Sequence, residues 1–418
     1  MDLMLRRARV EDGRPLVDIA IDQGRIVAVA PGLPDGADHT IDCEGRVVIP
    51  GLIEPHLHLD KALLDKEKPN LDGTLAGAIA VTGELKRGFT RDAVRSRVKR
   101  VLDQAIGNGT TAIRAHPDVD PIVGLLGVEV LVDLREQYRG LVDLQVVAFP
   151  QEGILKAPGT LEMLREALRR GADAVGGCTY NEVDVPSCER HVDLVFELAG
   201  EFGVPVDMHA DFADDTSDPR FAMAGYIADA TVNSGMSGRV TLGHMTSLAG
   251  IPREARLETM RRLAAAGVAV VALPATDMHL GGRSDAVNTR RGIVPVRDLW
   301  ASGVTCSYSS NNVRNAFTPY GNADPLDIGL FLAQTGHLSG PADLTRVLAM
   351  ATTEAAAVIG ISERYGIRVG ADADLVVLST QYLADALLDR PDRRFVIKGG
   401  HIVAETIRAT TIKEPVHA

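Results

Sequence analysis

The sequence is poor in aromatic residues and in cysteine, and it lacks any long apolar run. Aromatic residues make up 4% of the 418-residue chain, and none of its four cysteines, Cys43, Cys178, Cys188 and Cys306, belongs to a Cys-x-x-Cys pair. This scatter predicts reduced, buried thiols rather than a disulfide framework or a thiolate zinc site. No stretch approaches the roughly 20 apolar residues of a membrane span, and the N-terminal residues lack a signal-peptide pattern. We therefore expect a cytoplasmic protein without a membrane partner.

Basic residues are also scarce relative to acidic ones. The chain has 44 Lys and Arg against 56 Asp and Glu, which gives a formal net charge of −12. This balance disfavours binding to nucleic acid or to an anionic membrane as the main task. A small molecule, neutral or cationic, is the expected partner. Hydrophobic residues at 45% and charged residues at 24% are typical of a folded enzyme.

Both ends of the chain have the character of antiparallel β structure. Short apolar runs separated by turns fill the first 50 residues, with Gln23-Gly24 as one turn, and the far end has Gly399-Gly400 at the turn of a hairpin. We predict that residues 1–50 and 366–418 together form a small β-sandwich. Residues 51–365 would then form the second, larger domain.

Strand-like and helix-like segments alternate through that larger region. Short β-branched runs that end in polar residues are each followed by a segment with helical apolar spacing, which is typical of parallel βαβ units. One such helix starts after Thr90, a candidate N-cap, and another spans 160–171. The eight strand segments are 48–59, 110–117, 144–151, 174–181, 204–211, 239–246, 268–277 and 304–311. Eight units predict an α/β fold, a (β/α)₈ TIM barrel.

Histidines gather where these predicted strands end, which is the active-site face of such a barrel. His56 and His58 are two residues apart on the first strand, so both side chains point to the same face. His209 at the end of the fifth strand offers a third nitrogen. Three protein ligands with one open position are the arrangement of a hydrolytic metal site. A His-x-His pair alone is also compatible with two partly exposed strand histidines.

Several motifs resemble those of the cytosine deaminase branch of the amidohydrolase superfamily over almost the whole chain. The resemblance implies one divalent metal ion, zinc or iron, held by His56, His58 and His209, with Gln151 as a substrate contact and His244 as a base or electrostatic partner. The motifs are EPHLHLDKALL, FPQEGIL, VDMHAD, GHMTS, HLGGR and TRRGIVPVRDLWASGV.

Two positions depart from this branch. Where its strand 5 motif has a proton-shuttling glutamate this chain has Phe212, and where its strand 8 motif has a metal-binding aspartate this chain has Asn311. An amide coordinates metal only weakly and cannot act as a base. General acid–base groups contribute about 10²–10⁴-fold each. The two losses therefore argue against cytosine as the substrate.

Further residues near these motifs are candidates for proton transfer or for contact with the substrate. Asp211, or Asp214 and Asp215 in the loop that follows it, could supply the missing acid, although a solvated acidic loop is equally compatible with the last two. Phe212 could stack on a planar substrate or fill space, and Asn311 and His279 could contact substrate. His279 could equally bond to backbone.

Three further residues bear on the same site. His116 is interpreted as supporting the site or the core rather than binding metal. Lys61 could meet an anionic substrate or lie at the surface. Strand 4 ends in Cys178-Thr179-Tyr180 without a lysine, which favours one metal ion over two.

The leading hypothesis is a metal-dependent amidohydrolase that cleaves a C–N bond of a small cyclic or aromatic amide, amidine or amine. The alternative is a catalytically impaired paralogue that binds a ligand, motivated by Phe212 and Asn311. A third possibility is a hydrolase that activates water through His244 without metal. A homo-oligomer is possible in each case.

Overall fold

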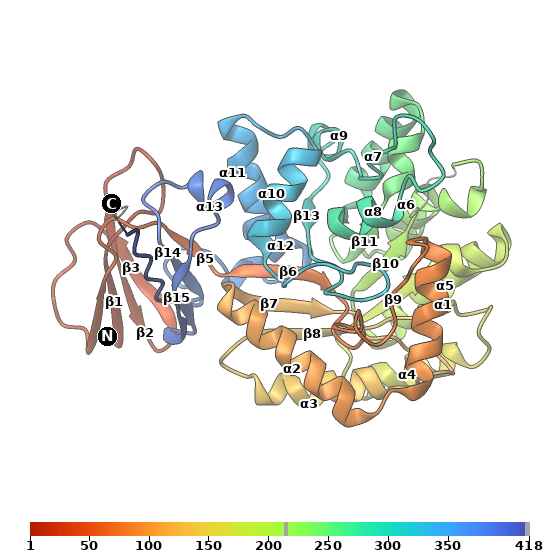
Figure 1. Ribbon diagram of the computed structural model, residues 1–418, viewed down its shortest axis with the longest axis horizontal. Helices are drawn as coiled ribbons and strands as arrows, with labels where there is room; N and C mark the ends of the chain where they lie inside the picture. Colours follow the sequence, from red (N-terminus) through yellow and green to blue (C-terminus); the bar gives the residue numbers. More distant parts are fainter. Residues whose placement is uncertain (213–215, 414–418) are drawn as a thin grey trace, which may run out of the picture.

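An eight-stranded, all-parallel sheet surrounded by helices forms the larger part of the computed structural model, which describes residues 1–212 and 216–413 (Figure 1). The first and last strands meet, because the Asn311 N–H donates to the carbonyl of His56 and the His58 N–H donates to the carbonyl of Asn311. The predicted (β/α)₈ barrel is confirmed. In sheet order its strands are β6 (Leu52–Leu57), β7 (Thr110–Ala115), β8 (Asp143–Ala148), β9 (Ala174–Cys178), β10 (Val206–Ala210), β11 (Val240–His244), β12 (Val268–Ala272) and β13 (Cys306–Tyr308).

Helices cover the outside of this barrel. The longest carry a buried apolar face against the strands, as α2 does with Val94, Val98 and Val101. The helices are α1 (Leu75–Leu85), α2 (Arg91–Gly107), α3 (Leu126–Gln137), α4 (Thr160–Arg169), α5 (Val185–Phe202), α6 (Ala224–Asn233), α7 (Arg253–Ala266), α8 (Pro274–Leu280), α9 (Val296–Ala301), α10 (Pro325–Thr335), α11 (Pro341–Met350), α12 (Thr353–Val358) and α13 (Asp385–Leu388). Short 3₁₀ turns lie at Lys86–Gly88, Thr179–Asn181, Pro219–Phe221, Thr246–Gly250 and Ser362–Arg364.

The two helix predictions agree with these bounds. The Thr90 hydroxyl accepts the Ala93 N–H and so caps α2 as expected. Helix α4 begins at Thr160 and buries Leu164, Ala167 and Leu168. All four cysteines are free and buried, which confirms the interpretation of the thiols.

Two four-stranded sheets from the chain ends pack together beside the barrel (Figure 1). Side chains from both sheets, among them Leu5, Ile19 and Leu375, share one buried core. The predicted Gly399-Gly400 turn is present between antiparallel strands, with φ of 54° and 79°. One sheet has the order β3 (Arg25–Ala30), β2 (Val17–Asp22), β1 (Leu3–Ala8), β4 (His39–Asp42), and the other has the order β16 (His401–Glu405), β15 (Arg393–Lys398), β14 (Leu375–Leu378), β5 (Val48–Pro50).

The observed barrel strands are shorter than the predicted segments, and two segments differ in kind as well as in length. The segment 48–59 splits at Gly51: its first part is β5 of the small unit and its second part is β6 of the barrel. Gly51 is needed there because a Cβ would lie 2.2 Å from the Thr111 hydroxyl oxygen. The segment 268–277 is strand only to Ala272, because Pro274 begins α8. The exact division into domains at 1–50, 51–365 and 366–418 stays a prediction.

Among the described residues, none of the helices combines the length and the apolar character that crossing a bilayer requires.

Candidate active site

Three imidazoles converge at the mouth of the barrel, as the sequence predicted. His56 is on β6, His58 follows it, and His209 is on β10. The Nε2 atom of His209 lies 3.1 Å from Nε2 of His56 and 3.0 Å from Nε2 of His58. Nitrogens around one tetrahedral zinc ion would be about 3.3 Å apart. The spacing therefore fits a single divalent ion.

Burial gives these imidazoles the protonation state that a ligand needs. It lowers the pKa of His56 to about 3 and holds the pKa of His58 and of His209 well below the usual value for histidine. The neutral rings keep a lone pair for a metal ion. Gly243 on β11 lets the His56 ring approach, since a Cβ at that position would lie 3.0 Å from the ring.

Neighbouring groups fix the orientation of two of the rings. The His58 Nδ1–H donates to the carbonyl oxygen of His116 at 2.8 Å, so Nε2 carries the free lone pair. The Nδ1 atom of His56 lies 3.7 Å from a carboxylate oxygen of Asp207, and His116 stacks on His56 with ring centroids 3.8 Å apart. His116 thus lies directly beside His56, and its interpretation as a supporting residue stays a prediction.

Asp207 on β10 was not singled out from the sequence. Burial alone would raise its pKa, but His116, at 3.0 Å, and Arg114, at 2.9 Å, hold the pKa far below the usual range. His56, His116 and Asp207 also have metal-ligand spacing. Arg114 already neutralises that carboxylate, so the three-histidine group is the better site for a cation.

His244 faces the three histidines from the end of β11. Its ring centroid is 5.0 Å from that of His209, and its Nδ1 lies 2.6 Å from a carboxylate oxygen of Asp277. The carboxylate can only accept, so it fixes the proton on Nδ1 and leaves Nε2 free. Burial raises the pKa of Asp277, and the neighbouring His244 opposes that rise. This pairing was not foreseen because Asp277 was expected at a strand end rather than on α8.

Two of the predicted site residues have other contacts. Both carboxylate oxygens of Asp211 accept backbone N–H groups, from Met223 at 2.7 Å and from Ala224 at 3.0 Å, where α6 begins. Asp211 does not line the cavity described below, and its role as an acid stays a prediction without support from these contacts. Asp214 and Asp215 lie outside the described residues.

His279 on α8 is also outside the cavity lining. Its Nδ1 lies 3.2 Å from the guanidinium of Arg283, and its ring meets Tyr320 edge to face. Its predicted contact with substrate is untested, and its ring meets protein groups instead.

A cavity of about 10 Å³ opens onto His58 and His209, two of the three convergent histidines. Phe212 lies in its wall and stacks on His244 with ring centroids 4.2 Å apart. The amide oxygen of Asn311 is buried and has no hydrogen-bond partner among the described residues. The lining residues are His58, Lys61, Leu75, Gln151, Tyr180, His209, Phe212, His244, Thr276, Asn311, Asn312 and Phe317. Gln151, Phe212 and Asn311 are thus all placed at the cavity.

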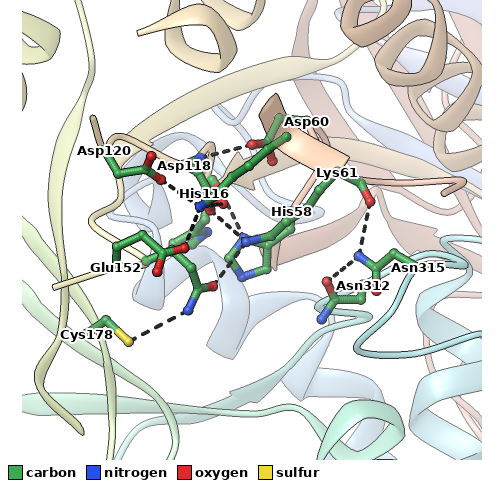
Figure 2. A network of polar contacts seen from close by, with 12 residues as sticks. His58, Asp60, Lys61, His116, Asp118, Asp120, Glu152, Cys178, Asn312 and Asn315 are labelled. Atoms are coloured by element: carbon green, nitrogen blue, oxygen red, sulfur yellow. Dashed lines mark hydrogen bonds and ion pairs between the residues drawn. The ribbon is translucent and has the colours of Figure 1, made fainter. Parts of the chain in front are cut away.

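Lys61 is buried in the wall of this cavity rather than exposed at the surface. Figure 2 shows the network of polar contacts to which it belongs. Its ammonium donates to Asp118 at 2.6 Å and to the side-chain oxygen of Gln151 at 3.1 Å. Lys86 pairs with the other oxygen of Asp118 and with Asp120 at 2.7 Å. A buried ionic network therefore stands behind one wall of the cavity.

Glu54, a further buried group, holds the last strand of the barrel in place. Its carboxylate accepts hydrogen bonds from the hydroxyls of Ser309 and Ser310 and, at 2.9 Å, from the Ser310 N–H. These contacts fix the backbone immediately before Asn311, which has φ of 59°. Asn311 is thereby held at the cavity by a strained, well-supported backbone.

Comparison with known proteins agrees with this geometry. A model of the amidohydrolase family matches residues 39–409. The N-isopropylammelide isopropyl amidohydrolase of Pseudomonas sp. (strain ADP) is 30% identical over 97% of each chain, and the pterin deaminase of Rhizobium rhizogenes is 29% identical over 95% of this chain and 90% of its own. The crystal structure of 5-methylcytosine deaminase from Klebsiella pneumoniae with 5-fluorocytosine superposes with a TM-score of 0.93, at 28% identity, over 99% of this chain and 100% of that one.

Proposed function

Because the chain belongs to the amidohydrolase family and is a hydrolase of C–N bonds other than peptide bonds, we propose that it releases ammonia or an amine from a small, single-ring heterocycle. The observation that carries this proposal is the convergence of three Nε2 atoms, with that of His209 lying 3.1 Å from that of His56 and 3.0 Å from that of His58, beside one cavity. The cavity is small, about 10 Å³, far below the roughly 300–1,000 Å³ typical of ligand pockets, so even a single ring requires the lining side chains to move apart and two fused rings require more.

His56, His58 and His209 would hold one zinc or iron ion, since neutral imidazoles suit both metals. Asn311 lines the same cavity as His58 and His209, and its buried amide oxygen, which has no hydrogen-bond partner among the described residues, is a candidate for a further ligand. When bound, such an ion lowers the pKa of a coordinated water to about 7 and makes it a nucleophile.

His244 is the group that moves protons in this proposal. Asp277 holds its ring with Nε2 free, so the ring can take a proton on Nε2 and the carboxylate stabilises the resulting imidazolium. The same Nε2–H can then donate to the departing nitrogen. One histidine with a buried carboxylate would thus perform work that the cytosine deaminase branch divides between two carboxylates.

Cytosine is not the proposed substrate. The phenyl ring of Phe212 stands where the branch has its proton-shuttling glutamate and stacks on His244, and the described residues that line the cavity include no carboxylate to protonate a ring nitrogen. A substrate that must be protonated only on its leaving group, and not on a ring nitrogen, needs one proton donor fewer in the site. Phe212 instead offers an apolar surface beside the substrate.

The test is a turnover screen of single-ring aminopyrimidines, cyclic amides and amino- or alkylamino-triazines, read out as release of ammonia or amine. We expect turnover with at least one of them, abolished by a chelator and restored by zinc or iron. The absence of any C–N hydrolysis by metal-replete protein would contradict the proposal. A rate that a chelator leaves unchanged would instead assign water activation to His244 alone.

A further inference from the structure

Gln151 reaches the wall of the cavity from a segment that has no regular secondary structure. Residues 151–156 follow β8 and form neither a helix nor a strand, although they carry most of the motif FPQEGIL. Backbone N–H groups that are shielded from water need acceptors, and such a segment has no helix or strand partner to supply them. Other groups must therefore hold the segment, and Gln151 with it, against the cavity.

Glu182 supplies these acceptors from the end of the neighbouring strand, β9. Its carboxylate accepts the backbone N–H groups of Ile154 at 2.6 Å, Leu155 at 3.1 Å and Lys156 at 2.9 Å. The side chain is buried, and it does not belong to the lining of the cavity. Hydrogen bonds to an ionised acceptor are among the strong ones in proteins. Three of them from consecutive residues fix the course of the chain after Gln151.

His191 on α5 holds Glu182 in turn. The Nε2 atom of His191 accepts the Cys178 N–H at 3.0 Å, so the ring proton is on Nδ1, which donates to Glu182 at 2.8 Å. Burial alone would raise the pKa of Glu182, but the bond from His191 and the backbone N–H groups lower it overall. The carboxylate is therefore charged, and its orientation is fixed by a buried ring whose two nitrogens are both engaged.

Gly153 lets the chain pass close to this carboxylate. Its φ is 88°, and a Cβ at this position would lie 2.9 Å from Oε1 of Glu182. Glycine avoids both the strained conformation and the close contact. The residues before it have separate partners: the side-chain amide of Asn181 donates to the Gln151 carbonyl, and Glu152 accepts from Lys86 at 2.7 Å. The glycine of the motif is thus explained by Glu182.

On this basis we propose that Glu182, oriented by His191, is a positioning residue that acts through residues 151–156 to set where Gln151 meets the substrate. The inference rests on the proposed function, because it takes the cavity beside the three histidines as the place where the ring binds. Glu182 itself lies outside the cavity lining. It therefore affects binding of the ring and leaves the metal ion and proton transfer at His244 unchanged.

Hydrogen exchange tests the holding of the segment without any need for turnover. In the metal-replete Glu182→Ala variant, the amides of residues 154–156 should exchange at least about tenfold faster than in the unaltered protein, because bonds to a charged acceptor are lost. Glu197→Ala, which removes an exposed carboxylate from α5, is the matched control and should leave this exchange unchanged. Equal exchange in Glu182→Ala and in the unaltered protein would overturn the proposal.

Steady-state kinetics with a ring compound that the protein turns over test the consequence for binding. In Glu182→Ala, KM should rise by about tenfold or more while kcat stays within about threefold, as expected when an interaction present in both the bound substrate and the transition state is lost. Metal content should not change. An unaltered kcat/KM in the folded variant would refute the positioning role. A loss of metal together with activity would also refute it, by making Glu182 a support of the whole site.

Glu182→Gln covers the case in which Glu182→Ala does not fold. Its amide oxygen can still accept from Ile154 and Leu155, but its NH₂ group cannot accept the Lys156 N–H. Exchange and KM should therefore lie between those of the unaltered protein and those expected for Glu182→Ala. Exchange at Lys156 as slow as in the unaltered protein would contradict the inference. Failure of the proposed function would appear in the turnover screen, whereas failure of this inference would appear in the exchange of residues 154–156.

Discussion

Two groups of buried polar residues at the cavity differ in charge. We call the group with His56, His58 and His209 the histidine wall and the group with Lys61 and Asp118 the lysine wall. On the histidine wall, His56, His58 and His209 are kept neutral by burial, and their orienting partners lie behind them. On the lysine wall, the charges of Lys61 and Asp118 are kept and paired. Neutral rings with free lone pairs suit a cation, whereas an ammonium that is already paired with a carboxylate does not attract one.

Removing a ligand from the histidine wall should have the largest effect. His209→Ala takes away the nitrogen that lies nearest to both partners, and turnover should fall by at least about 10⁴-fold because the activated water is lost. Steady-state assays with an active ring compound measure this. Lys66→Met, at the surface, should stay within about twofold of the unaltered protein. If His209→Ala retained a tenth of the activity, His209 would not be needed to activate water.

Asp277→Asn separates proton transfer from metal binding on the same wall. The amide can still fill the space, but its NH₂ group competes for Nδ1 of His244 and disturbs the ring's tautomer. We expect kcat to fall by about 10²–10⁴-fold with unchanged metal content. Metal content and kcat are therefore measured on the same preparation. A loss of metal together with activity would make Asp277 a structural residue of the site and not a partner of His244.

Restoring the missing carboxylates should move the cavity toward cytosine. In the double variant Phe212→Glu with Asn311→Asp, cytosine deamination should rise by about 10²-fold or more over the parent, since each acid–base group contributes about 10²–10⁴-fold. Thermal melting of the double variant checks that it folds. Unchanged cytosine activity in a folded double variant would mean that the two positions do not set the preference.

A change far from both walls should have the smallest effect. Thr90→Ala removes the hydroxyl that caps α2 and should lower the free energy of unfolding by about 1 kcal/mol without changing kcat. Urea unfolding measures this, with Ser96→Ala on the exposed face of the same helix as the control. A change in kcat with Thr90→Ala would show that the geometry of the active site depends on how α2 begins.

Local periodicity made much of this architecture predictable. His56 and His58 share a face because strand residues two apart do so, and the eight alternating units determined the barrel. Glycine pairs at Gly399-Gly400 predicted the hairpin for the same local reason. The position of His209 at a strand end then sufficed to place it at the mouth of the barrel.

The remaining features depend on contacts between distant segments. Asp277 meets His244 only because Pro274 ends the strand early and starts a helix. Asp211 is adjacent to the site in sequence, yet its φ of 50° and its bonds to the start of α6 direct it elsewhere. Lys61 becomes a buried cation through Asp118, which is 57 residues away. No local pattern encodes such pairs.

Elemental analysis of the purified protein and of His209→Ala decides whether the three histidines hold a metal ion. The account predicts about one zinc or iron ion per chain in the unaltered protein and a nearly complete loss in the variant, which should still melt cooperatively. Fully active protein that carries no stoichiometric metal, or a His209→Ala protein that keeps its ion, would contradict it.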